Sequence, residues 1–262
     1  MELQGRVDEL KTQGLGLVAI SYDSMETLKK FADSRGITFP LVSDPGSVII
    51  KRFGLFNTTV DPGNRAYGVP FPGTFIVDRQ GVVRARFFED AYQERNTVAS
   101  ILVRQGGRSR GPTSTVETPH LRVTTAVSDA RVAPGERLSL VFDVEPKAGM
   151  HVYAPGKHTY QVIRPSIDAQ SWLRVHDVQY PASEIYVFKP LNERVEVYQK
   201  PVRLVQDVTV LATPEVQKQL AGMTDLTISG RLEYQACDDK ICYMPQSIPV
   251  RWTLSVMPLD RK

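Results

Sequence analysis

The spacing of the hydrophobic residues changes once along this chain, near residue 104. Before that point, short apolar runs typical of buried strands alternate with segments whose apolar residues recur every three or four positions. After it, the helical spacing almost disappears, and short segments of alternating apolar and polar residues follow one another between turns. This pattern predicts two domains, an α/β domain followed by an all-β domain.

The first region predicts the elements of a three-layer α/β domain. Apolar residues at helical spacing, with capping residues beside them, predict helices, and apolar runs between turn signals predict strands. The expected helices cover residues 2–13, 24–36, 45–53 and 92–103, and the expected strands cover 16–21, 39–43, 74–77 and 82–88. Such alternation is typical of a sheet covered by helices.

The rest of the chain predicts a linker and a β-sandwich. Residues 104–118 contain almost no apolar side chains, which is typical of a linker. Over residues 119–262, alternating segments predict an antiparallel sandwich of about immunoglobulin size, with one short helix at 214–221. The predicted strand segments are 138–142, 151–153, 195–197, 202–204, 208–210, 226–228, 232–234 and 250–254. We therefore expect a first domain over 1–103, a linker and a second domain over 119–262.

Composition and charge exclude several classes of protein. Hydrophobic residues make up 42% and charged residues 23% of the chain, values typical of globular rather than disordered or fibrous proteins. The 32 basic and 29 acidic residues give a net charge of only +3, and no basic stripe indicates binding to nucleic acid. No apolar run approaches the ~18 residues of a membrane span. We therefore expect no nucleic-acid partner and no membrane span.

Three segments of the first region occur in an order and at a spacing that a known group of proteins shares. They are Val18–Ser24 (VAISYDS), Phe39–Pro45 (FPLVSDP) and Thr74–Gly81 (TFIVDRQG). With these segments, residues 1–103 resemble the redoxin group, which comprises the AhpC/TSA-type peroxiredoxins and their thioredoxin-like relatives. The resemblance implies a thioredoxin fold.

The first region departs from this group at the reactive positions. The resemblance places a reactive cysteine at the start of the helix before the 18–21 strand, where the helix N-terminus lowers the pKa of a thiol. The region contains no cysteine. Pro72 replaces an arginine of the peroxidases, as it does in the thioredoxin-like relatives, in which this proline is cis and lies against the dithiol. The resemblance therefore implies a Cys-x-x-Cys reductase ancestor, and we expect no peroxidase activity from this chain.

Two interpretations of the absent cysteine stay open. Either the sequence lacks an N-terminal piece with a central strand and the active-site motif, or the domain is a catalytically inactive remnant. A sheet without its central strand would expose unpaired backbone groups and apolar side chains. This cost favours the first interpretation, in which the sequence is a piece of a longer protein.

Both cysteines of the chain, Cys237 and Cys242, lie in the segment Leu232–Pro245 (LEYQACDDKICYMP). The frame Tyr-Gln-x-Cys…Cys-Tyr-x-Pro, supported upstream by Gly149–Tyr153 (GMHVY), makes the second region resemble the N-terminal, immunoglobulin-like domain of the thiol:disulfide interchange protein DsbD. Four residues separate the two cysteines, where the best-known DsbD pattern has five, so the loop geometry differs. The resemblance implies a redox-active cysteine pair.

The residues around the cysteines are consistent with this chemistry. Residues 232–236 and 243–250 predict two antiparallel strands joined by the loop 238–241. Directly opposed residues in such a pair have Cα atoms ~4.5–5.5 Å apart, a separation that a disulfide tolerates. Closing so short a loop stabilises a fold by only about 2 kcal/mol. The loop aspartates disfavour a thiolate and Lys240 offsets part of this effect, which suits a disulfide attacked by a partner thiol.

An inert structural disulfide is the alternative, because the sequence alone does not give the reduction potential that distinguishes a structural disulfide from a reactive one. A metal site is not expected, since two cysteines without a paired histidine supply too few ligands, and we expect no cofactor.

The resemblance to DsbD also implies an aromatic cap loop that shields the cysteines from oxidants. The matching stretch is 185–198, with Phe188 and Leu191 nearest to the cap position. An ordinary core position is the alternative for Phe188. Tyr153 and Tyr198 are further candidates to line the site, although tyrosine is common in any sandwich core.

Together these features predict a two-domain thiol–disulfide redox protein. The Cys237/Cys242 dithiol would exchange electrons with a thioredoxin-like or DsbD-like redox protein, or with the missing redoxin active site. The alternative is a non-catalytic interaction module, in which the redoxin domain is inactive and the disulfide is structural. The resemblance to DsbD implies a periplasmic location, and a cytoplasmic one stays open because no export signal opens the sequence.

Overall fold

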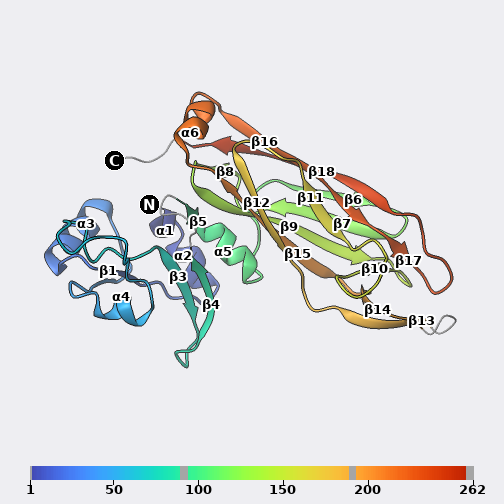
Figure 1. Cartoon of the computed structure of the whole chain (residues 1–262), viewed down its shortest axis with the longest axis horizontal. Coiled ribbons are helices and arrows are strands. Elements are labelled where there is room, and N and C mark those ends of the chain that lie inside the picture. Colours follow the sequence, from blue (N-terminus) through green and yellow to red (C-terminus); the bar gives the residue numbers. More distant parts are fainter. Residues whose placement is uncertain (1, 89–93, 189–192, 258–262) are drawn as a thin grey trace. The chain divides into compact units, whose positions relative to one another are not determined.

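The backbone contacts between residues divide the chain into two compact units. The computed structural model describes residues 2–88, 94–188 and 193–257. The first unit covers Met1–Val98 and the second covers Ala99–Lys262 (Figure 1). The structural division therefore falls inside the stretch that the sequence analysis assigns to the first domain.

The first unit contains short helices and two separate pairs of strands. Its elements are α1 (Glu2–Gly5), α2 (Val7–Thr12), β1 (Ala19–Ser21), α3 (Met25–Arg35), β2 (Leu41–Ser43), α4 (Val48–Arg52), β3 (Gly73–Val77), β4 (Val83–Phe88) and β5 (Arg95–Asn96). β1 and β2 pair in parallel, whereas β3 and β4 form a separate antiparallel pair. All four strands that the sequence predicts here are present, with ends that differ by a few residues.

Capping groups define the helices of this unit. The Ser24 side chain accepts a hydrogen bond from the backbone N–H of Thr27 at the start of α3, and Gly36 ends the helix in the left-handed conformation. The buried Asp44 carboxylate accepts the backbone N–H groups of Val48 and Ile50 at 2.9 Å and so caps α4. These caps satisfy backbone donors that a short helix cannot pair internally.

From residue 98 onward the chain is built mainly of strands. The elements are α5 (Val98–Arg104), β6 (Thr113–Glu117), β7 (Leu121–Val127), β8 (Arg131–Val132), β9 (Glu136–Pro146), β10 (His151–Tyr153), β11 (Arg164–Ile167), β12 (Leu173–Gln179), β13 (Glu184–Phe188), β14 (Glu193–Tyr198), β15 (Val202–Val210), α6 (Pro214–Leu220), β16 (Asp225–Tyr234), β17 (Ala236–Cys237) and β18 (Gln246–Val256). Three sheets result, with the strand orders β12-β15-β9-β7-β6, β11-β16-β18-β8 and β13-β14-β10-β17. None of the helices in the described part of the chain is both long and apolar enough to cross a membrane.

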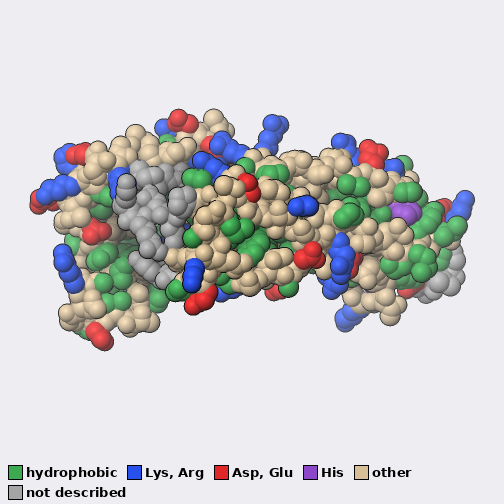
Figure 2. All heavy atoms as spheres, turned by 90° about the horizontal axis from the view of Figure 1, so that it is seen from above, with side chains coloured by type: hydrophobic (Ala, Val, Ile, Leu, Met, Phe, Trp, Pro, Cys, Tyr) green, Lys and Arg blue, Asp and Glu red, His purple; other side chains and the backbone are tan. Residues whose placement is uncertain are grey.

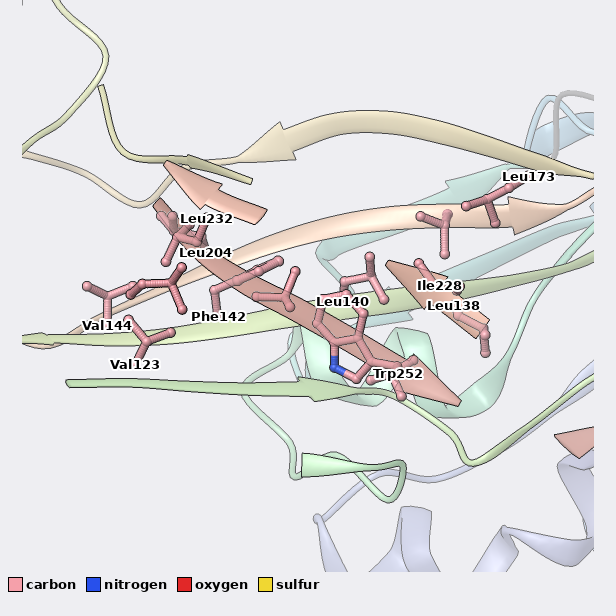
Figure 3. Close-up of a cluster of buried hydrophobic side chains, with 14 of the residues drawn as sticks. Val123, Leu138, Leu140, Phe142, Val144, Leu173, Leu204, Ile228, Leu232 and Trp252 are labelled. Carbon is pink, nitrogen blue, oxygen red and sulfur yellow. The ribbon is translucent and has the colours of Figure 1, made fainter. Parts of the chain in front are cut away.

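The core of the second unit lies between its sheets (Figure 3). In β18, buried and exposed residues alternate from Ile248 to Leu254, which gives that strand one apolar face. Trp252 from this face meets Phe142 of β9, with ring centroids 5.7 Å apart in an edge-to-face arrangement. The predicted sandwich architecture therefore has a continuous apolar core of its own.

Two pairs of predicted strands are continuous in the structure. The segments 202–204 and 208–210 both belong to β15, and the segments 226–228 and 232–234 both belong to β16. Gly230 lies between the two apolar segments of β16, and a glycine at such a position is also typical of a turn between two strands. Here a Cβ atom at Gly230 would lie 2.4 Å from the backbone oxygen of Ser166, so this glycine permits the close approach of β11 instead.

Part of the expected linker over 104–118 is structured within the second unit. β6 pairs antiparallel with β7, and all five of its residues are exposed. The side chains of an exposed edge strand face water, as those of a linker do, so both segments are polar and composition does not distinguish them. Arg104 forms an ion pair with Asp207, whose side chain is 3% exposed and also accepts a 2.8 Å hydrogen bond from the Ser139 hydroxyl.

We expect Arg104→Ala to destabilise the second unit. The variant leaves the buried Asp207 carboxylate without its cation, a change that typically costs about 3–5 kcal/mol. Arg164→Ala is the control, because Arg164 is 59% exposed in its ion pair with Glu233 and such pairs contribute little. Urea denaturation followed by circular dichroism measures both losses. Equal and small losses in the two variants would contradict a structural role for Arg104.

Candidate functional site

The two cysteines form a disulfide where the chain passes from one sheet to another. β16 pairs with β18 as far as Tyr234↔Gln246, and the next residues turn into β17, which pairs with β10 in the register His151↔Cys237. Cys237 and Cys242 face each other in an isolated antiparallel bridge, with Cα atoms 4.1 Å apart. The expected disulfide is present. The expected hairpin with the loop 238–241 is also present, because the backbone N–H of Tyr243 donates to Ala236 at 2.9 Å and that of Asp238 donates to Ile241 at 3.0 Å. What the sequence does not predict is that Cys237 also pairs with β10 of another sheet.

The two sulfur-bearing residues differ in their exposure to solvent. Cys237 is 1% exposed and packs with Tyr153, Val195 and Val197 in a small apolar cluster. Cys242 is exposed. A thiol from solution or from a partner therefore reaches Cys242 more readily than Cys237.

The loop between the cysteines is held by Asp238. One carboxylate oxygen accepts the backbone N–H groups of Lys240 and Ile241 at 2.7 Å, and the other accepts the Tyr243 hydroxyl at 2.9 Å. The hydrogen bond from the backbone of Lys240 contributes most to holding the pKa of Asp238 below its ordinary value, followed by those from Ile241 and Tyr243. Asp238 is therefore an ionised anchor for the loop.

Tyr153 on β10 is the polar side chain that contacts the disulfide. Its hydroxyl oxygen lies 3.0 Å from Cys237 Sγ and 3.4 Å from Cys242 Sγ. Its ring stacks on Tyr160 with centroids 4.2 Å apart, and the Tyr160 hydroxyl donates a 2.8 Å hydrogen bond to Glu193. Burial raises the pKa of Tyr153 far above its ordinary value, so the phenol keeps its proton and can donate it in a hydrogen bond to sulfur.

His151 shares the face of β10 that carries Tyr153. It lies directly opposite Cys237 in the strand pairing and is buried. Its ring packs against Tyr186 with centroids 4.5 Å apart and meets Tyr153 edge to face at 5.6 Å. Burial lowers the pKa of His151 below its ordinary value, and the negative charge of Asp238 acts in the opposite direction. A neutral imidazole is therefore held beside the oxidised cysteine pair.

The structure brings some of the predicted site residues to the disulfide and separates others from it. Tyr153 contacts both sulfurs. Tyr198 points to the opposite face of its strand, because it pairs with Val152 and packs in the main core, where its hydroxyl bonds to the backbone oxygen of Pro181. A one-residue step along a strand reverses the side chain, and this separates Tyr198 from the cysteines.

The cap candidates lie on or near the hairpin of β13 and β14. Phe188 is partly buried and occupies the same face of β13 as Tyr186, two residues earlier. Because Tyr186 contacts His151, Phe188 lies on the disulfide side of this sheet. Leu191 lies outside the described residues. Phe188 therefore retains its place as a cap candidate.

Pro72 lies in the first unit, just before β3. None of the peptide bonds in the described ranges is cis, so Pro72 differs from the cis proline that the resemblance to thioredoxin-like proteins suggests. An X–Pro bond prefers trans by about 0.5–1 kcal/mol unless its surroundings hold the cis form. The cysteines of this chain both lie in the second unit, so no dithiol of the first unit packs against this proline.

Sequence reasoning missed the aromatic and acidic groups around Tyr153, namely His151, Tyr160, Tyr186 and Glu193. His151 is two residues before Tyr153, and this spacing would have placed both on one face of a strand. The other groups come from different segments, and only the strand pairing brings them together. Figure 2 shows hydrophobic side chains and a histidine at the surface of the sandwich end that carries β13, β14 and β17.

Comparison with known families agrees with this geometry. Residues 119–251, just over half of the 262 residues, match the family model described as thiol:disulfide interchange protein DsbD, N-terminal. The chain belongs to the DsbD N-terminal family. Residues 1–86 match the AhpC/TSA family model. Both resemblances noted in the sequence are thereby confirmed, and so is the fold class, a thioredoxin-like redoxin domain followed by an immunoglobulin-like sandwich.

Individual relatives cover parts of the chain. Alkyl hydroperoxide reductase E of Mycobacterium tuberculosis is 34% identical over 85 residues, which are 32% of this chain and 51% of that protein. The chain spans about half the length of the curated relatives it matches. Among solved structures, the N-terminal periplasmic domain of ScsB from Proteus mirabilis matches 56% of this chain and 54% of its own length, at 14% identity and a TM-score of 0.38. The reduced N-terminal domain of DsbD from Neisseria meningitidis matches 45% of this chain and 80% of its own length, at 15% identity and a TM-score of 0.30.

The DsbD N-terminal match and the Cys237–Cys242 disulfide together support a thiol–disulfide redox function. The AhpC/TSA match adds a second fold used in thiol chemistry, although this copy contains no cysteine. In the DsbD N-terminal domain of this chain, the chemistry therefore centres on one disulfide and the aromatic cluster around it.

The lowered pKa of His151 predicts a pH dependence of stability. Unfolding restores the ordinary pKa of about 6.5, so the unfolded chain binds more protons than the folded one as the pH falls through that value. We expect the oxidised protein to lose stability between about pH 7 and pH 5, by about 1.4 kcal/mol for each unit of pKa difference. His151→Phe should reduce this loss.

The measurement is urea denaturation at a series of pH values, with wild type and His151→Phe compared. His176→Gln serves as a control, because His176 lies on β12 in another sheet, where its ring is 2.8 Å from the Thr209 hydroxyl. An unchanged pH dependence in His151→Phe would show that this histidine binds protons equally in the folded and unfolded states.

Proposed function

We propose that this protein carries out reversible thiol–disulfide exchange through Cys237 and Cys242 with a thioredoxin-like protein that contributes a pair of thiols. The observation that carries the proposal is the difference between the two cysteines. One is exposed to an incoming thiol, and the other is buried beside a hydrogen-bond donor. An inert staple does not need this arrangement.

In the proposed reaction, a thiolate of the partner attacks Cys242 Sγ. The new bond joins the partner sulfur to Cys242, the bond between Cys242 and Cys237 breaks, and its electron pair leaves on Cys237 Sγ. The second thiol of the partner then attacks the mixed disulfide and releases Cys242. Two electrons pass from the partner dithiol to this protein, and the partner leaves as a disulfide.

Tyr153 stabilises the leaving sulfur in this scheme. The phenol hydroxyl lies 3.0 Å from Cys237 Sγ, and burial keeps it protonated, so it donates a hydrogen bond to the developing thiolate. The stacked Tyr160 holds the Tyr153 ring in place and is itself fixed by Glu193. A low-pKa leaving thiol departs faster, so this contact favours attack at Cys242.

The proposal places the chemistry in residues 119–262 and none in residues 1–103, which contain no cysteine. We propose an oxidising compartment, and specifically the periplasm, as the site of action. Disulfides persist in such compartments, and membership of the DsbD N-terminal family supports the assignment.

We expect attack at Cys242 to be visible as a trapped intermediate. The oxidised wild-type protein is mixed with a reduced thioredoxin whose second active-site cysteine is replaced by alanine, so the mixed disulfide cannot be resolved by the partner. Acid quenching, alkylation and peptide mass spectrometry should find the partner linked to Cys242, with Cys237 free. A link at Cys237 would reverse the assignment of the two sulfurs.

The same experiment separates redox exchange from the staple. The disulfide should open while the sandwich stays folded, because a loop this short contributes only about 2 kcal/mol. Near-ultraviolet circular dichroism of the variant with both cysteines replaced by alanine checks this. If no mixed disulfide forms with the native protein, or if the double variant does not fold, the disulfide is structural.

We expect Phe188→Ala to increase the rate at which hydrogen peroxide oxidises the reduced protein by several-fold, because the side chain lies on the disulfide face of β13. Val187→Ala is the matched control, since Val187 is exposed on the opposite face of the same strand. Loss of free thiol over time measures both rates. Equal rates in the two variants would assign Phe188 to ordinary packing.

A further inference from the structure

We infer that His151 takes up a proton when the disulfide is reduced and pairs with the Cys237 thiolate as an imidazolium. This inference rests on the proposed function and extends it to the fate of the protons. In the complete reaction, a partner dithiol gives up two electrons and two protons. Cys242 receives one proton as its thiol, and His151 receives the other, while Cys237 remains a thiolate.

The strand pairing places the two groups side by side. His151 and Cys237 are directly opposed in the antiparallel pair of β10 and β17. Side chains of directly opposed residues point to the same face, with Cβ atoms about 4.5–5.5 Å apart. The imidazole therefore lies beside Cys237, whose sulfur leaves in the proposed exchange, whereas Cys242 faces Cys237 from the other side, in the antiparallel bridge.

Groups from every neighbouring element surround this imidazole. Tyr153 meets it from its own strand, and Tyr186 packs on its ring from β13. Asp238 comes directly after Cys237, the last residue of β17, and its charge acts on His151. Glu193 on β14 is engaged with Tyr160. Asp238 is the carboxylate that acts on His151 in the oxidised state, and it favours the protonated form.

Reduction of the disulfide shifts His151 toward its protonated form. In the oxidised state the sulfur carries no charge, and burial favours the neutral imidazole. A thiolate on Cys237 adds a negative charge at close range in a region of low dielectric, which favours the imidazolium. The pKa of His151 therefore rises on reduction, and by reciprocity the imidazolium lowers the pKa of the Cys237 thiol.

The first test compares the wild-type protein in its two redox states. Proton NMR titration of the imidazole should give a higher pKa for His151 in the reduced state than in the oxidised state, by at least one pH unit. His176 serves as the internal reference, because it lies in another sheet, and its pKa should stay the same. Equal pKa values for His151 in the two states would overturn the inference without any variant having to fold.

The second test measures the thiolate directly. Absorbance at 240 nm against pH gives the pKa of Cys237 in reduced wild type, in His151→Gln and in His176→Gln, each carrying Cys242→Ala so that one thiol titrates. His151→Gln should raise the pKa of Cys237 by about one unit, which means about tenfold less thiolate at a pH below that pKa. His176→Gln should not change it. An unchanged titration in His151→Gln would also overturn the inference.

These results are distinguishable from failure of the proposed function. If the oxidised wild type forms no mixed disulfide with a thioredoxin, the exchange reaction itself is wrong, whatever His151 does. If the mixed disulfide forms at Cys242 and the pKa of Cys237 does not depend on His151, the exchange stands and this inference alone is wrong.

Discussion

The geometry of the site depends on a change of strand pairing: β16 pairs with β18, whereas the next two-residue strand, β17, pairs with β10 of another sheet. Ala236 and Cys237 leave the strand direction of β16 and pair with β10, which carries both His151 and Tyr153. This pairing buries one cysteine against polar and aromatic side chains. The five-residue return to Cys242 then leaves the other cysteine at the surface.

The main core of the second unit includes neither cysteine. The core around Phe142 and Trp252 is formed by long strands whose pairing does not involve either cysteine. The loop between the cysteines is fixed separately by the carboxylate of Asp238. We therefore expect the core and most of the loop contacts to remain when the sulfur–sulfur bond opens, as the proposed reversible exchange requires.

The sequence was sufficient for the features that local pattern encodes. The short strands of the first unit, helix α6 and the cysteine pair were all predicted, because apolar spacing, capping residues and the cysteine frame are local signals. Long-range pairing was not predictable. The sequence predicts separate strands at 226–228 and 232–234, because the role of Gly230 between them depends on the approach of β11. It predicts a linker over residues 113–117, because an exposed edge strand has no apolar face.

Because long-range strand pairing was not predictable, only part of the site could be predicted from the sequence. Tyr153 was predicted to lie beside the cysteines and does so, but Tyr198 was predicted with equal reason and faces the main core. Which face of a strand meets the disulfide depends on register, and register depends on pairing between distant segments. The contribution of His151 escaped notice because a lone histidine without ligand spacing gives no signal until its cross-strand neighbour is known.

The unequal depth of the two sulfurs also restricts which thiols react. A thiolate must approach the attacked sulfur roughly along the line of the bond that breaks. Because Cys237 is buried and Cys242 is exposed, that line opens toward solvent at Cys242. Cys237 instead packs against Tyr153, with Tyr160 and Tyr186 beside it. One sulfur is thus open to solvent while the other is buried among aromatic rings, and in the proposed exchange this difference makes Cys242 the sulfur that a partner thiol attacks.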